Sequence, residues 1–202
     1  SALLLGQTWH PLYGDVAPQI LNLNMGAPFQ PFSRAPQIRY RYKTGDIQIT
    51  GAALWQSQYL SQGPEGKSQK YIKNSCVPEI YAGIDYKHKG LLIGAGIEMV
   101  SLTPRTQATV EDKIYKVSER ITSLSYEVHM KYNSEKWLVA AKSVLGSNLT
   151  QTSMLGGYGI KSIDPRTGEQ EYSPNRNSSS WINIVYGCLL YTSPSPRDRS
   201  VS

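Results

Sequence analysis

Polar and apolar residues alternate one by one along much of the chain, the pattern of a β-strand with two different faces. The clearest case is residues 38–43, where one face is apolar and aromatic and the other is cationic; the two sets are Ile38, Tyr40 and Tyr42, and Arg39, Arg41 and Lys43. A strand lining a water-filled channel in a membrane shows this pattern, with lipid on one face and the pore on the other. A soluble barrel would instead point its apolar face inward.

The alternation predicts eight strands joined by connections that are long and short in turn. The expected strands cover residues 1–8, 38–43, 47–56, 77–87, 91–99, 124–132, 137–145 and 181–186, and the long connections cover 9–36, 57–75, 101–119 and 147–179. Antiparallel strands with short turns at one end and long loops at the other follow the plan of bacterial outer-membrane barrels. We therefore expect an all-β, antiparallel, up-and-down transmembrane β-barrel, here an incomplete, curved piece of about eight strands.

Length and composition agree with this fold class. The 202 residues suffice for one domain, and no apolar run reaches the roughly 18–20 residues of a membrane helix, which barrel strands do not need. The formal net charge is +6, but the basic residues are dispersed and have no aromatic stacking platform beside them. We therefore expect no nucleic-acid partner.

The two ends of the chain differ from the ends of a complete barrel protein. Residues 1–5 lack an initiating Met and a signal peptide, so we expect residues 1–187 to be an internal part of a larger barrel. Residues 188–202 resemble a translated sequencing adapter, and we interpret them as a non-native tail. Without this tail Cys76 is the only cysteine, which excludes a disulfide within the chain.

Aromatic residues gather at the ends of the expected strands. Four on the apolar face lie beside short turns and one lies at the far end of its strand; the four are Tyr42, Tyr86, Tyr132 and Trp137, and the fifth is Trp55. Rings at one depth are typical of the girdles at membrane–water interfaces.

Three motifs, in their order and spacing, resemble the trimeric DcaP-like porins of Gram-negative outer membranes. They are GQTWHP at residues 6–11, GAPFQPFSR at 26–34 and PQIRYRY at 36–42. Residues 156–181 also resemble the Bacteroidetes branch of such barrels, so the resemblance covers nearly all of 1–187. It implies passive uptake of small, often anionic solutes by a homotrimer in outer-membrane lipid, without a cofactor.

The strand parity predicts which charged side chains line the pore. Arg39 and Arg41 are the strongest candidates, with Arg34 beside them; the full set is Arg34, Arg39, Arg41, Lys43, Glu79, Asp85, Lys87, Glu98, Glu127, His129, Lys131 and Lys142. Charged rings on a channel wall select ions by sign. The alternative is that these charges pair across the lumen and only solvate the wall.

No motif for catalysis or metal binding accompanies these residues. Glu127, His129 and Lys131 share a face but lack a nucleophile motif, so we expect no enzyme. The three histidines have no ligand spacing, so no metal site is predicted. The alternative function is a soluble or non-transporting β-barrel that acts as a binding or structural module.

The first long connection is expected to shape the channel. Residues 9–36 are Pro-rich and contain Phe29 and Phe32, which would be costly to expose. We expect this segment to fold inward, bring Arg34 towards the other two arginines, and form a cationic constriction. Packing against a trimer partner is the alternative.

Overall fold

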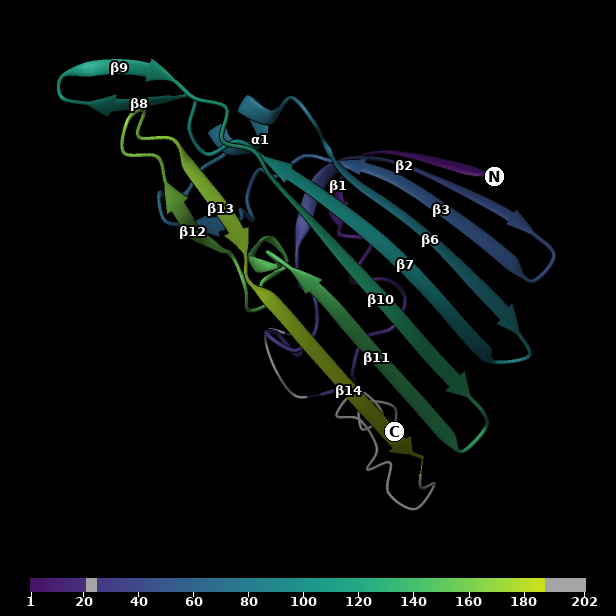
Figure 1. The fold of residues 1–202 in the computed structure, drawn as a ribbon. Coiled ribbons are helices and arrows are strands. Elements are labelled where there is room, and N and C mark those ends of the chain that lie inside the picture. The colour runs from purple at the N-terminus through teal and green to yellow at the C-terminus, as the bar shows by residue number, and fades with distance from the viewer. Residues whose placement is uncertain (21–24, 188–202) are drawn as a thin grey trace, which may run out of the picture.

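The computed structural model of the chain describes residues 1–20 and 25–187, so the adapter-like tail lies outside the described residues. An eight-stranded antiparallel sheet forms the body of the molecule, in the order β1-β2-β3-β6-β7-β10-β11-β14 (Figure 1). Its strands are β1 (Ala2–Trp9), β2 (Arg34–Thr44), β3 (Ile47–Leu54), β6 (Glu79–His88), β7 (Leu91–Leu102), β10 (Ile121–Asn133), β11 (Trp137–Ser147) and β14 (Arg176–Tyr186). Every neighbour in the sheet is also the next long strand along the chain, which confirms the up-and-down plan.

The long connections contain structure that alternation alone did not predict. Three two-stranded hairpins form there: β4 (Gln62–Gly63) with β5 (Gly66–Lys67), β8 (Gln107–Val110) with β9 (Lys113–Lys116), and β12 (Tyr158–Ile163) with β13 (Gln170–Pro174). A short helix α1 (Lys70–Ser75) and a 3-10 turn η1 (Thr150–Thr152) complete them. Two of the hairpins, β8–β9 and β12–β13, extend beyond the ends of the main strands, opposite the short turns (Figure 1). No helix in the described part of the chain is long and apolar enough to cross a membrane.

The two faces of the sheet have the polarity predicted for a membrane barrel. Ile38 and Val128, on the apolar face, expose 58% and 56% of their surface, and the aliphatic and aromatic residues around them are also exposed. The opposite face holds buried polar residues such as Arg39, Glu98 and Glu127. A soluble barrel would bury its apolar face, so the structure has the reverse arrangement.

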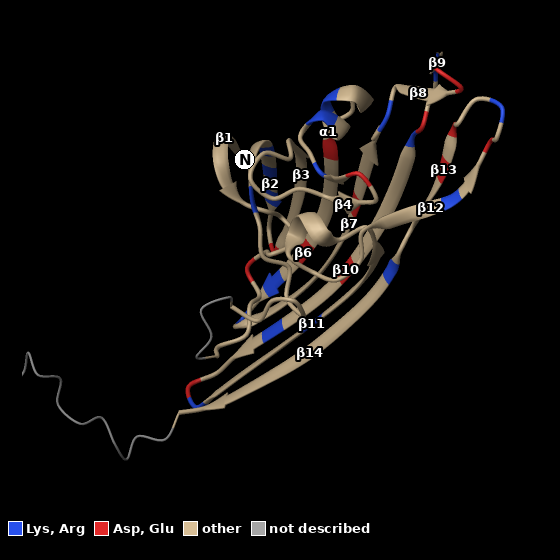
Figure 2. Ribbon diagram, turned by 90° about the vertical axis from the view of Figure 1, so that its left-hand side faces the viewer, with Lys and Arg blue, Asp and Glu red and all other residues tan. Residues whose placement is uncertain are grey.

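Loop segments cover the concave, polar face of the sheet, as the view along the sheet shows (Figure 2). One apolar cluster lies between this face and the loops: Leu12 packs with Leu54, Tyr81 and Val144, together with Leu149 and Met154 of the last long connection. Val16 packs on Leu92 and Ala140 in a second cluster nearer the short turns. The first long connection therefore folds inward across several strands, which confirms the expected direction of this segment.

Candidate functional site: the polar inner face

Strand register brings the predicted pore-face residues into rows across the sheet. In one row Arg39 lies opposite Ala52, which lies opposite Tyr81, which lies opposite Glu98. Each of these residues pairs with the residue directly opposite it on the next strand, so all side chains of one row point to the same face of the sheet. The inner face is thus a continuous polar surface assembled from strands far apart in the sequence.

His129 is the centre of one buried network on this surface. Its Nδ1 lies 3.0 Å from Glu127 Oε2 and its Nε2 lies 2.9 Å from Asp85 Oδ1. Tyr81 donates its hydroxyl to Glu127 Oε1 at 3.0 Å, and Gln48 donates to Asp85 Oδ2 at 3.0 Å. Each carboxylate therefore has two partners, as buried charged groups require.

Two glycines make room for this network. Gly83 and Gly96 are cross-strand partners, and a Cβ built on either would lie 2.5 Å or 2.3 Å from the Tyr81 hydroxyl oxygen. The Tyr81 ring therefore lies over a pair of positions that have no side chain. This explains why positions 83 and 96 are glycine.

The inserted segment, which we define as residues 10–33, is held to the inner face by buried cations. Lys142 donates from Nζ to the carbonyl oxygens of Leu12 and Tyr13 at 2.8 and 2.7 Å. Arg39 donates from Nε to Gln37 Oε1 at 2.8 Å and from Nη2 to the carbonyl of Trp9, the last residue of β1 before the segment. These cations bind protein groups instead of facing an open lumen.

A more exposed ion pair joins the segment to β6. Lys87 Nζ lies 2.9 Å from Asp15 Oδ2, and both side chains keep contact with solvent. Burial by itself raises the pKa of Asp15, but the hydrogen bond and charge of Lys87, with the charges of Arg41 and His129, outweigh it and lower the pKa below its ordinary value.

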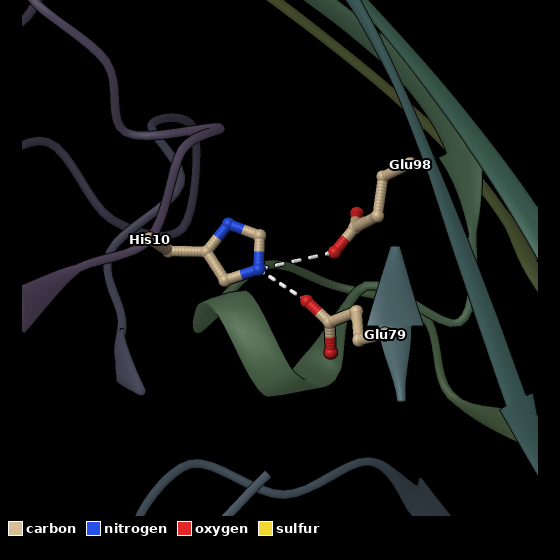
Figure 3. A group of neighbouring side chains, drawn as sticks. All are labelled: His10, Glu79 and Glu98. Atoms are coloured by element: carbon tan, nitrogen blue, oxygen red, sulfur yellow. Dashed lines mark hydrogen bonds and ion pairs between the residues drawn. The ribbon is translucent and has the colours of Figure 1, made fainter. Parts of the chain in front are cut away.

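A histidine from the inserted segment meets two glutamates from neighbouring strands (Figure 3). His10 Nε2 contacts Glu79 Oε1 directly and lies 3.1 Å from Glu98 Oε1. The relative exposures of His10, Glu79 and Glu98 are 2%, 2% and 0%. We call these three residues the His10 triad.

Two influences act in opposite directions on the proton state of His10. Burial by itself lowers its pKa, but the charges of Glu79 and Glu98 outweigh burial and raise the pKa to about 10. The backbone N–H of Leu12 points at Nδ1 from 3.2 Å and favours a ring without a proton on that nitrogen. The two glutamates favour a protonated, positively charged His10 ring between them, whereas the Leu12 N–H favours a neutral ring.

Three of the predicted cations remain without a partner in the described part of the chain. The side chains of Arg41, Lys43 and Lys131 form no salt bridge or hydrogen bond with residues 1–20 or 25–187. All three lie on the inner face, towards the short turns, at half-buried or exposed positions. They are the inner-face cations that the described contacts leave without a direct partner.

Two expectations about the inserted segment were wrong. Arg34 belongs to β2, shares a face with Ile38, and lies over the Trp9 ring at 5.4 Å, so it does not join Arg39 and Arg41. It forms the first pair of the β1–β2 ladder with Trp9, which fixes it to the outer face. Phe29 is 62% exposed, whereas Phe32 packs edge-on against Trp9 and Tyr59.

The aromatic residues expected near the short turns all lie exposed on the outer face. Tyr42, Tyr86, Tyr132 and Trp137 are each about half exposed, and Trp137 packs on Tyr186 of β14 with ring centroids 4.6 Å apart. Trp55 lies one residue beyond β3, at the opposite end of the sheet.

The His10 triad is the group that sequence reasoning missed. His10 and Glu79 are 69 residues apart, and Glu98 comes from a third element, so no spacing rule connects them. Only the inward fold of the segment after β1 places the ring beside β6 and β7. The prediction that the chain contains no catalytic centre stays a prediction.

The chain has little similarity to known proteins. No protein-family model and no curated protein matches it. Among solved structures, OmpT (in-vitro folded), an outer membrane protein of Vibrio cholerae, is similar with a TM-score of 0.44 and 11% sequence identity, over 72% of this chain and 42% of that chain. The chain thus spans less than half the length of that protein, and a likeness this distant carries no argument about function.

Proposed function

We propose that this chain forms part of the wall of an outer-membrane diffusion channel for small, anionic, hydrophilic solutes. The observation that carries the proposal is the polarity of the sheet, whose outer face exposes residues such as Ile38 and Val128 while its inner face buries charges. An exposed apolar band outside and a polar interior are the features of a transmembrane β-barrel. Aromatic residues beside the short turns support the same orientation in lipid.

The preference for anions is inferred from the balance of paired and unpaired charges. Lys142 is occupied by the inserted segment, Arg39 by Gln37 and the carbonyl of Trp9, and Lys87 is paired with Asp15. Arg41, Lys43 and Lys131 form no salt bridge within the described ranges of the inner face, although the charge of Arg41 also acts on Asp15. Unpaired cations on a channel wall attract anions and repel cations.

The resemblance of residues 6–42 to the trimeric DcaP-like porins supports the same function. We propose a homotrimer for the full-length protein and passive transport without a cofactor. The inserted segment would narrow the channel, with Arg41 in place of Arg34 as the main cation beside it.

Two measurements on the full-length protein test this function. The first is membrane class: extraction should require detergent, and the folded protein should migrate differently on gels before and after heating. Solubility without detergent would contradict the membrane assignment.

The second measurement is ion selectivity in planar bilayers. Arg41→Gln should lower the anion/cation permeability ratio, whereas Lys113→Gln, on the exposed strand β9 outside the main sheet, should leave it unchanged. An unchanged ratio in Arg41→Gln would remove the cationic wall from the mechanism. A protein that inserts but conducts no ions would instead support a non-transporting barrel.

A further inference from the structure

The His10 triad differs from the other buried carboxylates in how its charge is satisfied. Glu127 accepts one hydrogen bond from Tyr81 and contacts His129 through its other oxygen. Glu98 is fully buried, yet neither of its carboxylate oxygens accepts a hydrogen bond from any part of the chain that the structure describes. A buried carboxylate is costly unless it is paired, protonated or bound to a metal.

The net charge of the triad limits what could neutralise it. With His10 neutral, as the Leu12 N–H at Nδ1 favours, the two glutamates bring a net charge of −2 into a site without solvent. Either two protons or one divalent cation brings this charge to zero. The two possibilities differ in chemistry and can be distinguished by experiment.

The geometry of the triad matches a metal site. One donor atom from each of His10, Glu79 and Glu98 lies within 4.8 Å of the other two. The 3.1 Å between His10 Nε2 and Glu98 Oε1 is close to the edge of about 3.4 Å that a tetrahedron has with ligands about 2.1 Å from the metal. All three groups point towards one another (Figure 3).

We propose that the His10 triad binds one divalent transition-metal cation, with Zn²⁺ as the ion that its donors match best. One imidazole nitrogen and two carboxylates are a donor set suited to Zn²⁺, whereas Ca²⁺ and Mg²⁺ prefer oxygen ligands alone. Gln56 supports the site from behind, because its Nε2 donates to Glu79 Oε2 at 3.2 Å and leaves Oε1 directed at His10.

Binding exchanges protons of the triad for the metal ion. The metal takes the position of the proton on His10 Nε2, so the neutral ring must carry its proton on Nδ1 instead. The Leu12 N–H then gives up its 3.2 Å contact with Nδ1, and the direct contact between His10 and Glu79 opens to admit the ion. The two protons that neutralise the metal-free triad leave for solvent as the ion binds, so the site stays neutral and the remaining ring proton is the one on Nδ1.

The consequence of metal binding is a fixed inserted segment. His10 belongs to that segment, while Glu79 begins β6 and Glu98 lies in β7. A shared ion would tie the segment to two strands at the end of the sheet that carries the long loops. The metal site would form whether or not the barrel transports solutes.

The test is Zn²⁺ binding to full-length protein that has been treated with chelator in detergent. All proteins carry His88→Ala and Cys76→Ser, because the exposed His88–Asp46 pair and the exposed thiol could bind Zn²⁺ themselves. We expect one Zn²⁺ per chain by calorimetric titration with zinc chloride. Glu98→Gln should weaken binding by about 10- to 100-fold or more.

A matched control and a second measurement make the result decisive. Glu127→Gln removes another buried inner-face carboxylate and should leave Zn²⁺ affinity unchanged. X-ray absorption at the zinc edge, which needs no change in the triad, should show nitrogen and oxygen ligands at about 2.0–2.2 Å. Absence of Zn²⁺ binding, or binding that Glu98→Gln does not weaken, would overturn the proposal in favour of a triad neutralised by protons.

Discussion

Val128 and His129 are neighbours in β10, yet they lie in opposite environments. The Val128 side chain is more than half exposed on the outer face, while His129 is buried on the inner face between Glu127 and Asp85. The outer face has few specific contacts and depends on its surroundings, since apolar surface is stable only against lipid or another protein. The inner face is stabilised by particular partners, each needed to satisfy a buried polar group. Substitutions on the two faces should therefore destabilise the protein for different physical reasons.

The largest expected effect is a charge on the outer face. Val128→Arg should destabilise the folded protein in liposomes by about 2–4 kcal/mol, because an arginine near the bilayer midplane must leave water. Urea unfolding followed by heat-modifiable mobility would measure this loss. Ile114→Arg is the matched control, since Ile114 is an exposed apolar residue of β9 outside the main sheet and should tolerate the charge. Equal tolerance at both positions would mean that the outer face does not meet lipid.

Substitutions of Gly96 and Gly51 compare the inner and outer faces without introducing a charge. Gly96→Val should cost about 1–3 kcal/mol, because its side chain would enter the space of the Tyr81 ring and displace Tyr81 from Glu127. Gly51 is also mid-strand but on the outer face, and no atom lies within 4 Å of the position that a Cβ would take there, so Gly51→Val should be neutral or slightly stabilising. The same unfolding assay compares the two. If both variants were equally stable, the inner face would be looser than its contacts indicate.

These positions also show how much of the structure could be predicted from the sequence. Alternation was sufficient for the eight strands, their order and the identity of the outer face, because strand parity depends only on local sequence. It could not show that Arg34 falls on the outer face, since that depends on β2 beginning at Arg34 and on its pairing with Trp9. Nor could it show the His10 triad or the anchoring of Lys142, because both depend on the path of a Pro-rich segment that has no periodic pattern.

The next prediction concerns the anchor of the inserted segment. Lys142→Met leaves the buried carbonyl groups of Leu12 and Tyr13 without their donor, at a cost of about 1–3 kcal/mol that falls on the segment instead of the whole sheet. Protease cleavage within residues 10–33 should become faster, while the unfolding of the sheet changes little. Lys131→Met serves as the control, because Lys131 shares the inner face but contacts no acceptor among the residues described. Unchanged cleavage in Lys142→Met would show that the segment is held by its apolar contacts alone.

The smallest expected effect is a pH dependence of the same segment, which follows from the Asp15–Lys87 pair. The pKa of Asp15 is lowered in the folded protein, so the pair contributes its full stability above the ordinary aspartate pKa of about 3.9 and loses it as the pH falls through the lower folded value. The contribution is small because both side chains are partly exposed to solvent. Hydrogen exchange of residues 10–20, corrected for intrinsic rates, should show protection that is complete above the ordinary aspartate pKa of about 3.9 and declines over the pH range below it. Asp15→Asn should show the weaker protection already at the upper end of this range and a smaller change below it. If the two proteins had the same pH profile, the decline would belong to other carboxylates of the inner face, and the Asp15–Lys87 pair would be a contact without energetic weight.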